Sequence, residues 1–122
     1  MKIEVSNGEI VDKLTILELK RENAQTQEQA RHIVEELEYL QPIVDGMDIP
    51  VDIINQLREV NKKLWEVEDM LRGYEKKGVF DRQFITFARA VYQTNHARFR
   101  LKSTVNELTN SLFVEEKIHP EI

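Results

Sequence analysis

The chain has 122 residues, a formal net charge of −5, a charged fraction of 32% and no cysteine. This length suits one domain with a modest core, and the composition is typical of a soluble helical protein. The acidic balance argues against general nucleic-acid binding, and the lack of cysteine excludes disulfides and thiolate metal sites. No apolar run reaches membrane length. We therefore expect one cytoplasmic domain over residues 1–122, with no nucleic-acid or membrane partner.

Two helices are expected in the first third of the chain. The first begins at Ser6-Asn7-Gly8-Glu9, a capping box in which the serine hydroxyl accepts the Glu9 amide and Glu9 can reach back. The second is expected to begin at a similar cap on Thr26 and to stop before Pro42, because proline interrupts a helix. The polar stretch from Glu22 to Gln29 leaves one long kinked helix open as an alternative.

Two longer helices are expected to form an antiparallel hairpin over residues 51–111. The first of them starts near Pro50 and carries an apolar seam with alternating four- and three-residue spacing, which suits bundle packing. Gly78 follows it as a terminating residue, and Asp81 caps the next helix after a short turn. The chain is thus predicted to be an all-α antiparallel bundle of three to four helices, with a tail from about residue 113.

The last long helix carries polar residues where a buried stripe should be apolar. Its inward stripe starts with Phe84, Ala88 and Val91 and continues with Asn95, Arg98, Lys102 and Asn106. Residues 81–106 hold five Arg or Lys against one acid, so this helix carries a net positive charge although the whole chain is acidic. Two cations one turn apart repel, and burying either without a partner is costly. Carboxylates of a neighbouring helix or an anionic ligand must therefore balance Arg98 and Lys102.

A second polar line lies beside the apolar seam of the third helix, so the two long helices are expected to present one groove. Arginine offers a planar fork for carboxylate or phosphate, tyrosine and asparagine orient a ligand, and tryptophan stacks. The residues expected to line this groove are Trp65, Glu68, Arg72, Tyr92, Asn95, Arg98 and Lys102. The structural alternative is a satisfied buried network in which Glu68 and Glu75 neutralise Arg72 and Arg98.

This groove favours a non-enzymatic binding or interaction module for an anionic small molecule or a protein partner. It needs no cofactor and no metal. A related possibility is an accessory protein that acts only by binding another protein.

Acidic pairs on two helices support an enzymatic alternative. Glu35 and Glu38 lie three residues apart, as do Glu66 and Asp69, and two such helix faces can hold Mg²⁺. The pattern resembles the all-α nucleotide pyrophosphohydrolases of the MazG and dimeric dUTPase type. Glu35-Glu36-Leu37-Glu38 misses their E-E-x-x-E spacing by one position. The alternative function is therefore a Mg²⁺-dependent nucleotide pyrophosphohydrolase.

Three groups of residues carry a family likeness that spans nearly the whole chain. They are Asp12-Lys13-Leu14-Thr15-Ile16-Leu17 with Lys20; Asn61, Leu64-Trp65, Glu68-Asp69 and Arg72; and Ala88-Arg89, Val91-Tyr92, Asn95, Arg98, Lys102 and Asn106 with Glu115-Glu116-Lys117. Through these residues the chain resembles a family of short bacterial and phage proteins of unknown function. The resemblance implies a single helical domain and no particular activity. It also implies that Lys13 belongs with Glu68, Arg72, Arg98 and Lys102, so Lys13 joins the predicted ligand-binding residues.

Apolar positions outside the main seams indicate a partner surface. They are Ile16, Leu19, Ile43, Phe87 and Phe99. Four helices of this size rarely cover all their apolar surface, and an exposed apolar patch usually marks an interaction site. We therefore expect a homodimer or a larger homo-oligomer.

Overall fold

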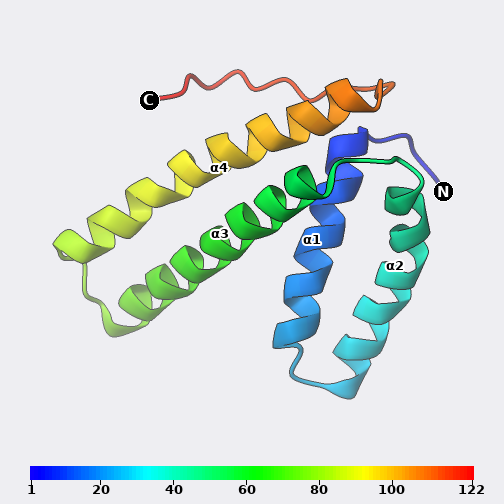
Figure 1. Cartoon of the computed structure of the whole chain (residues 1–122). Helices are drawn as coiled ribbons and strands as arrows, with labels where there is room; N and C mark the ends of the chain where they lie inside the picture. Colours follow the sequence, from blue (N-terminus) through cyan, green and yellow to red (C-terminus); the bar gives the residue numbers. More distant parts are fainter.

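The computed structural model describes residues 1–122 and contains four α-helices and no strand (Figure 1). The helices are α1 (Asn7–Asn23), α2 (Gln27–Asp45), α3 (Val51–Lys77) and α4 (Arg82–Leu108). The predicted all-α class is confirmed, and the first two helices are separate. None of the four combines the length and the apolar character that a membrane span requires.

Side-chain caps fix where three of the helices begin. In each, the residue before the helix accepts a hydrogen bond from the amide three positions later, at 3.1–3.3 Å: Ser6 from Glu9, Thr26 from Gln29 and Asp81 from Phe84. Each such cap contributes on the order of 1 kcal/mol. Gly78 ends α3 in the left-handed region with φ 68°, as its position after the last turn predicts.

Two helix ends differ from the sequence prediction. The expected stop before Pro42 is wrong, because α2 continues to Asp45 with the proline in its last turn. Only three helical residues follow the proline, so the lost hydrogen bond and local distortion are confined to the helix end. Helix α4 ends at Leu108 rather than near residue 111, and Asn110 follows with a left-handed φ of 49°.

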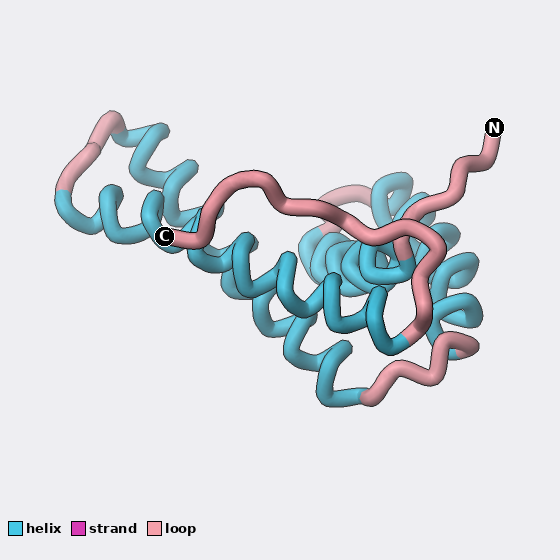
Figure 2. The backbone as a smooth tube through the Cα atoms, turned by 90° about the horizontal axis from the view of Figure 1, so that it is seen from above, coloured by secondary structure: helices cyan, strands magenta, loops and turns pink.

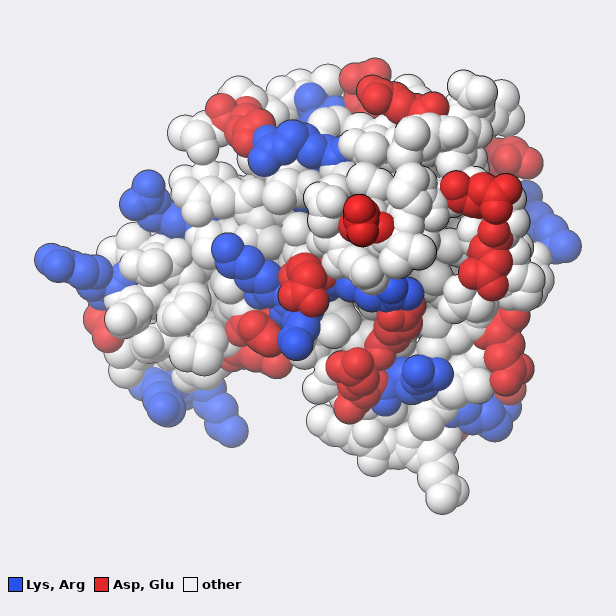
Figure 3. All heavy atoms as spheres, in the orientation of Figure 1, with Lys and Arg blue, Asp and Glu red and all other residues white.

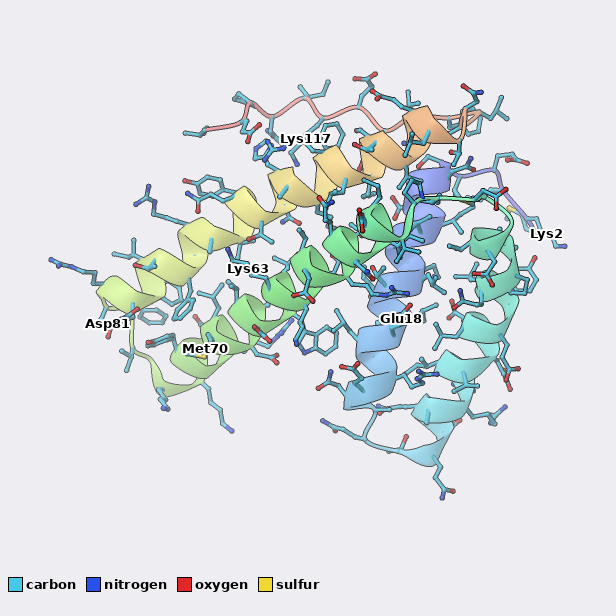
Figure 4. All side chains as sticks on the ribbon, in the orientation of Figure 1. Lys2, Glu18, Lys63, Met70, Asp81 and Lys117 are labelled. Atoms are coloured by element: carbon cyan, nitrogen blue, oxygen red, sulfur yellow. The ribbon has the colours of Figure 1, made fainter.

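The fold consists of two helical hairpins, α1–α2 and α3–α4, and α1 packs against both helices of the second hairpin (Figures 1 and 2). Helix α1 contacts all three other helices, whereas α2 contacts α1 alone, and α3 packs along α4. Arg58 of α3 and Glu18 of α1, the latter labelled in Figure 4, form a bidentate pair at 2.8 and 3.1 Å, which ties the two hairpins together. Helix α1 is therefore the element that positions every other helix.

The apolar core lies around α1. Its buried members come from all four helices and the turn after α2: Val11, Leu14, Leu17, Leu37, Val44, Ile49, Leu57 and Val105. No residue between Val67 and Thr94 is fully buried, so the turn end of the α3–α4 hairpin extends beyond this core. Of the five apolar residues expected to form a partner surface, only Ile43 is exposed. The other four are half-buried.

Charges of both signs are spread over the face seen in Figure 3, although acidic side chains gather along α2 at its edge. Helix α2 holds five acids and one arginine. Basic side chains gather at the turn end of the α3–α4 hairpin. Since this face shows no continuous basic surface, an anion site here has to be local, formed by a few converging side chains.

Candidate functional site

A close crossing of α1 over α4 creates the polar centre of the protein. A Cβ added to Gly8 would lie only 2.4 Å from the backbone oxygen of Lys102, so glycine alone fits here without a shift. The Gly8 N–H donates to Asn106 Oδ1 at 2.6 Å, and the Asn7 N–H donates to Ser111 Oγ at 2.9 Å. The crossing brings the acidic residues of α1 against the polar stripe of α4.

Asp12 is the buried partner of Arg98. Its side chain is 1% exposed and accepts hydrogen bonds from Arg98 Nε at 2.8 Å and Nη2 at 2.5 Å. Asn61 Nδ2 donates to Asp12 Oδ1 at 2.9 Å and to Thr15 Oγ1 at 2.8 Å. The hydrogen bonds that Arg98 donates to Asp12 raise the pKa of Arg98 against the opposing effect of burial. The bidentate pair leaves Arg98 Nη1 without a hydrogen bond inside the protein.

Lys102 lies between two carboxylates. Its side chain is 7% exposed, and Nζ is 2.8 Å from Glu9 Oε2 and 3.2 Å from Glu115 Oε1. Burial alone would lower the pKa of Lys102, but the hydrogen bond and charge of Glu9, with the charge of Asp12 and the hydrogen bond of Glu115, raise it above its ordinary value. The ammonium therefore stays charged inside the protein. Glu9, which could have reached back to cap α1, uses its carboxylate to bind α4.

A pocket of about 320 Å³ opens beside Lys102, and we call it the α4 pocket. Seven residues line it: Asn95, Arg98, Phe99 and Lys102 of α4, Glu9 of α1, and Glu115 and Lys117 of the C-terminal tail. Figure 4 shows Lys117 where the tail passes α4. Lys117 Nζ is 5.8 Å from the centroid of the Phe99 ring, and no carboxylate lies within 4.0 Å of it. The α4 pocket thus contains one cation without an ionic partner.

A family model described as "Family of unknown function (DUF6165)" matches residues 1–120. The chain belongs to this family. No curated protein and no solved structure matches the chain. Membership of DUF6165 brings no activity with it, so the function has to be argued from the residues themselves.

Three of the eight predicted ligand-binding residues meet in this DUF6165 protein. Asn95, Arg98 and Lys102 line the α4 pocket together. The other residues that line this pocket belong to the start of α1 and to the tail, and none of them belongs to α3. The carboxylates that balance the two cations are accordingly Asp12, Glu9 and Glu115. Of the balance expected from Glu68 and Glu75, only the pair of Glu68 with Arg72 forms, and it lies on the exposed surface of α3.

The other five predicted residues lie elsewhere. Lys13 is exposed and pairs with Glu36 of α2 at 3.3 Å. Arg72 is exposed on α3 beside Glu68 and Asp69, at 3.7 and 3.3 Å, and Tyr92 is exposed on α4. Trp65 lines a separate pocket of about 500 Å³ with residues of the α1–α2 turn. The structure therefore divides the predicted set among several surfaces.

Five residues that line the pocket or bind its cations were not predicted from the sequence as site residues: Glu9, Asp12, Phe99, Glu115 and Lys117. Asp12 carried a usable signal, because it lies between Val11 and Leu14 on the buried stripe of α1. A charged residue in such a stripe requires a partner. The tail residue Lys117 carried no signal, since an extended segment has no helical period that places it against α4.

The carboxylates of the enzymatic alternative are not brought together in this DUF6165 protein. Glu35 and Glu38 belong to α2, whereas Glu66 and Asp69 belong to α3, and these two helices do not contact each other. No group of three carboxylate or imidazole side chains has a metal-binding arrangement anywhere in the chain. The geometry therefore gives no support to the pyrophosphohydrolase alternative.

Proposed function

We propose that this protein is a small helical binding module that holds a single oxyanion group, a carboxylate or a phosphate, in the α4 pocket. The observation that carries the proposal is the unpaired ammonium of Lys117 at the rim of the pocket. Arg98, whose Nη1 makes no hydrogen bond inside the protein, lines the same pocket. Charge-assisted hydrogen bonds from such donors are the usual means of holding an oxyanion.

The charge of the lining suits a group of low charge. Three cations of the lining meet three carboxylates, because Asp12 neutralises Arg98 in addition to the two glutamates of the lining. The site is thus neutral without a ligand, and Lys117 alone offers a charge that has no ionic partner. The volume lies near the lower limit of ligand pockets, which run from about 300 to 1,000 Å³. A small anion or the terminal group of a larger molecule therefore fits this pocket better than an extended cofactor.

The cations divide into two roles. Arg98 and Lys102 are held by Asp12 and Glu9, so they join α1 to α4 and stabilise the fold. Lys117 contributes no ion pair to the fold. Its substitution consequently tests ligand binding without removing the buried network.

The test measures binding of inorganic phosphate and of citrate by calorimetry, with the pocket located by NMR shift changes. We expect Lys117→Ala to weaken binding about tenfold, as the loss of one charge-assisted bond implies. Lys63→Ala is the matched control, since Lys63 is an exposed lysine of α3 outside the pocket (Figure 4). Absence of saturable binding by both probes, or equal loss in the two variants, would refute the proposal.

A further inference from the structure

The C-terminal tail turns its charged side chains toward the protein. Residues 112–122, called the tail strand below, run beside α4 on the outside of the molecule (Figures 1 and 2). Three of their odd-numbered residues contact α4: Glu115 binds Lys102, Lys117 lies over Phe99, and Glu121 pairs with Arg100. Odd-numbered residues of an extended segment share one face. The charged face of the tail strand is therefore the inner one.

The apolar side chains of the tail strand face water. Leu112, Val114, Ile118 and Ile122 are all even-numbered, and they are 59–89% exposed. Soluble proteins normally bury such residues or leave them scattered, and a contiguous exposed set usually marks an interaction surface. Between Val114 and Ile118 the tail strand thus turns Glu115 and Lys117 toward α4 and its two apolar side chains toward water. Phe113, at an odd position, is exposed as well.

The backbone of the tail strand is also unpaired. No backbone–backbone hydrogen bond involves residues 112–122, and the only side-chain bond to this backbone is that of Ser111 Oγ to the Phe113 carbonyl. An extended segment with free N–H and C=O groups is an open edge to which another strand can add. Both the side chains and the backbone therefore leave the tail strand ready for a partner strand.

We propose that the tail strand pairs with the same segment of a second copy, antiparallel about a two-fold axis at Glu116. In this register Val114 of each copy lies opposite Ile118 of the other copy. Glu115 of each copy likewise lies opposite Lys117 of the other. Apolar and opposite-charge pairs are the cross-strand pairs that stabilise a sheet. The segment is therefore complementary to itself, as an interface with two-fold symmetry requires.

The same register sets limits on the strength of the dimer. Glu116 meets Glu116 of the second copy on the axis, and directly opposed like charges are destabilising. Residues 112–122 span at most about 36 Å by 10 Å, because the backbone bends at Leu112, Phe113 and His119, so pairing buries no more than on the order of 700 Å² in total. Interfaces of this size are weak and transient. We expect a dissociation constant on the order of 100 µM, and Glu116→Gln should lower it.

A cysteine placed on the axis tests the register directly. The chain has no cysteine of its own. Directly opposed residues of antiparallel strands have Cα atoms about 4.5–5.5 Å apart, which falls within the range that a disulfide spans. The full chain carrying Glu116→Cys should form disulfide-linked dimers at least about tenfold faster than the chain carrying Glu22→Cys. Glu22 is exposed at the end of α1, far from the tail strand in the sequence.

Sedimentation of the wild-type chain up to several hundred micromolar supplies the second measurement. Val114→Asp with Ile118→Asp should abolish the dimer, whereas Val51→Asp, an exposed apolar position outside the tail, should not. Neither Val114 nor Ile118 lines the α4 pocket, so a loss of the dimer in this variant can be distinguished from a loss of anion binding. A chain that stays monomeric throughout with equal cross-linking of both cysteine variants would overturn the proposal. A dimer that persists in the doubly substituted chain would overturn it as well.

Discussion

Arg98 and Asp12 are 86 positions apart in the sequence, and their side chains form a bidentate ion pair at 2.5 and 2.8 Å. The carboxylate has almost no access to water, and the guanidinium is about three-quarters covered. This pair joins the first helix to the last across the centre of the fold. Its burial means that each charge depends on the other, because a desolvated charge without a partner is strongly destabilising.

Replacement of Arg98 by alanine should therefore destabilise the protein by about 3–5 kcal/mol, the usual cost of breaking a buried pair. Urea denaturation followed by circular dichroism measures the change. Arg72→Ala is the matched control, because Arg72 pairs with Glu68 and Asp69 on the exposed surface of α3. An exposed pair contributes about 0–1 kcal/mol. Similar losses in the two variants would contradict a buried structural role for Arg98.

Simultaneous replacement of both partners should cost much less than the sum of the single replacements. In the double variant Arg98→Leu with Asp12→Asn, no uncompensated charge remains, and the amide that replaces the carboxylate can still bond Asn61. We expect a coupling energy of about 2–3 kcal/mol from the double-mutant cycle. Additive losses would show that the two side chains act independently, against the geometry described here.

Two glycines of the chain should respond to alanine in opposite directions. Gly8→Ala places a methyl group 2.4 Å from the Lys102 carbonyl oxygen, so the crossing of α1 and α4 must widen. Such overpacking costs about 1–3 kcal/mol. Gly73 lies inside α3 with nothing within 4 Å of an added methyl, and alanine there should stabilise the protein by about 0.5–1 kcal/mol. Thermal unfolding of the two variants checks both signs, and a tolerated Gly8→Ala would contradict the close crossing.

Hydrophobic spacing and caps were sufficient to predict a bundle of three to four helices and the α3–α4 hairpin, although they left open whether the first two helices are separate. The same spacing identified Lys102 as a buried cation, because it continues the inward stripe of α4. The identity of its partner could not be predicted this way. Glu9 reaches Lys102 only because Gly8 lets α1 cross α4 closely, and this contact joins residues 93 positions apart. Local patterns contain no information about such a crossing.

The sequence predicted only the helical part of the α4 pocket, because the rest of the lining comes from the tail. Asn95, Arg98 and Lys102 belong to a helix, whose period indicates which side chains share a face. Glu115 and Lys117 belong to an extended tail, and no period relates such a tail to the helix beside it. The contribution of the tail to the site consequently emerges only from the three-dimensional structure.

The stability of the protein should depend on the charge of Lys102 at alkaline pH. Its folded-state pKa lies above the ordinary value of 10.5, since Glu9, Asp12 and Glu115 favour the charged form more than burial disfavours it. A lysine with a raised pKa contributes stability that is fully present below its unfolded-state pKa and is lost as the pH rises through its folded-state pKa. We therefore expect the free-energy difference between the wild type and Lys102→Met to be constant up to about pH 10 and to shrink above it. Urea titrations from about pH 8 to about pH 12 measure this difference, with Lys63→Met as the control that should show no such change. A difference that stays constant to the highest pH would mean that the ammonium of Lys102 contributes nothing through its charge.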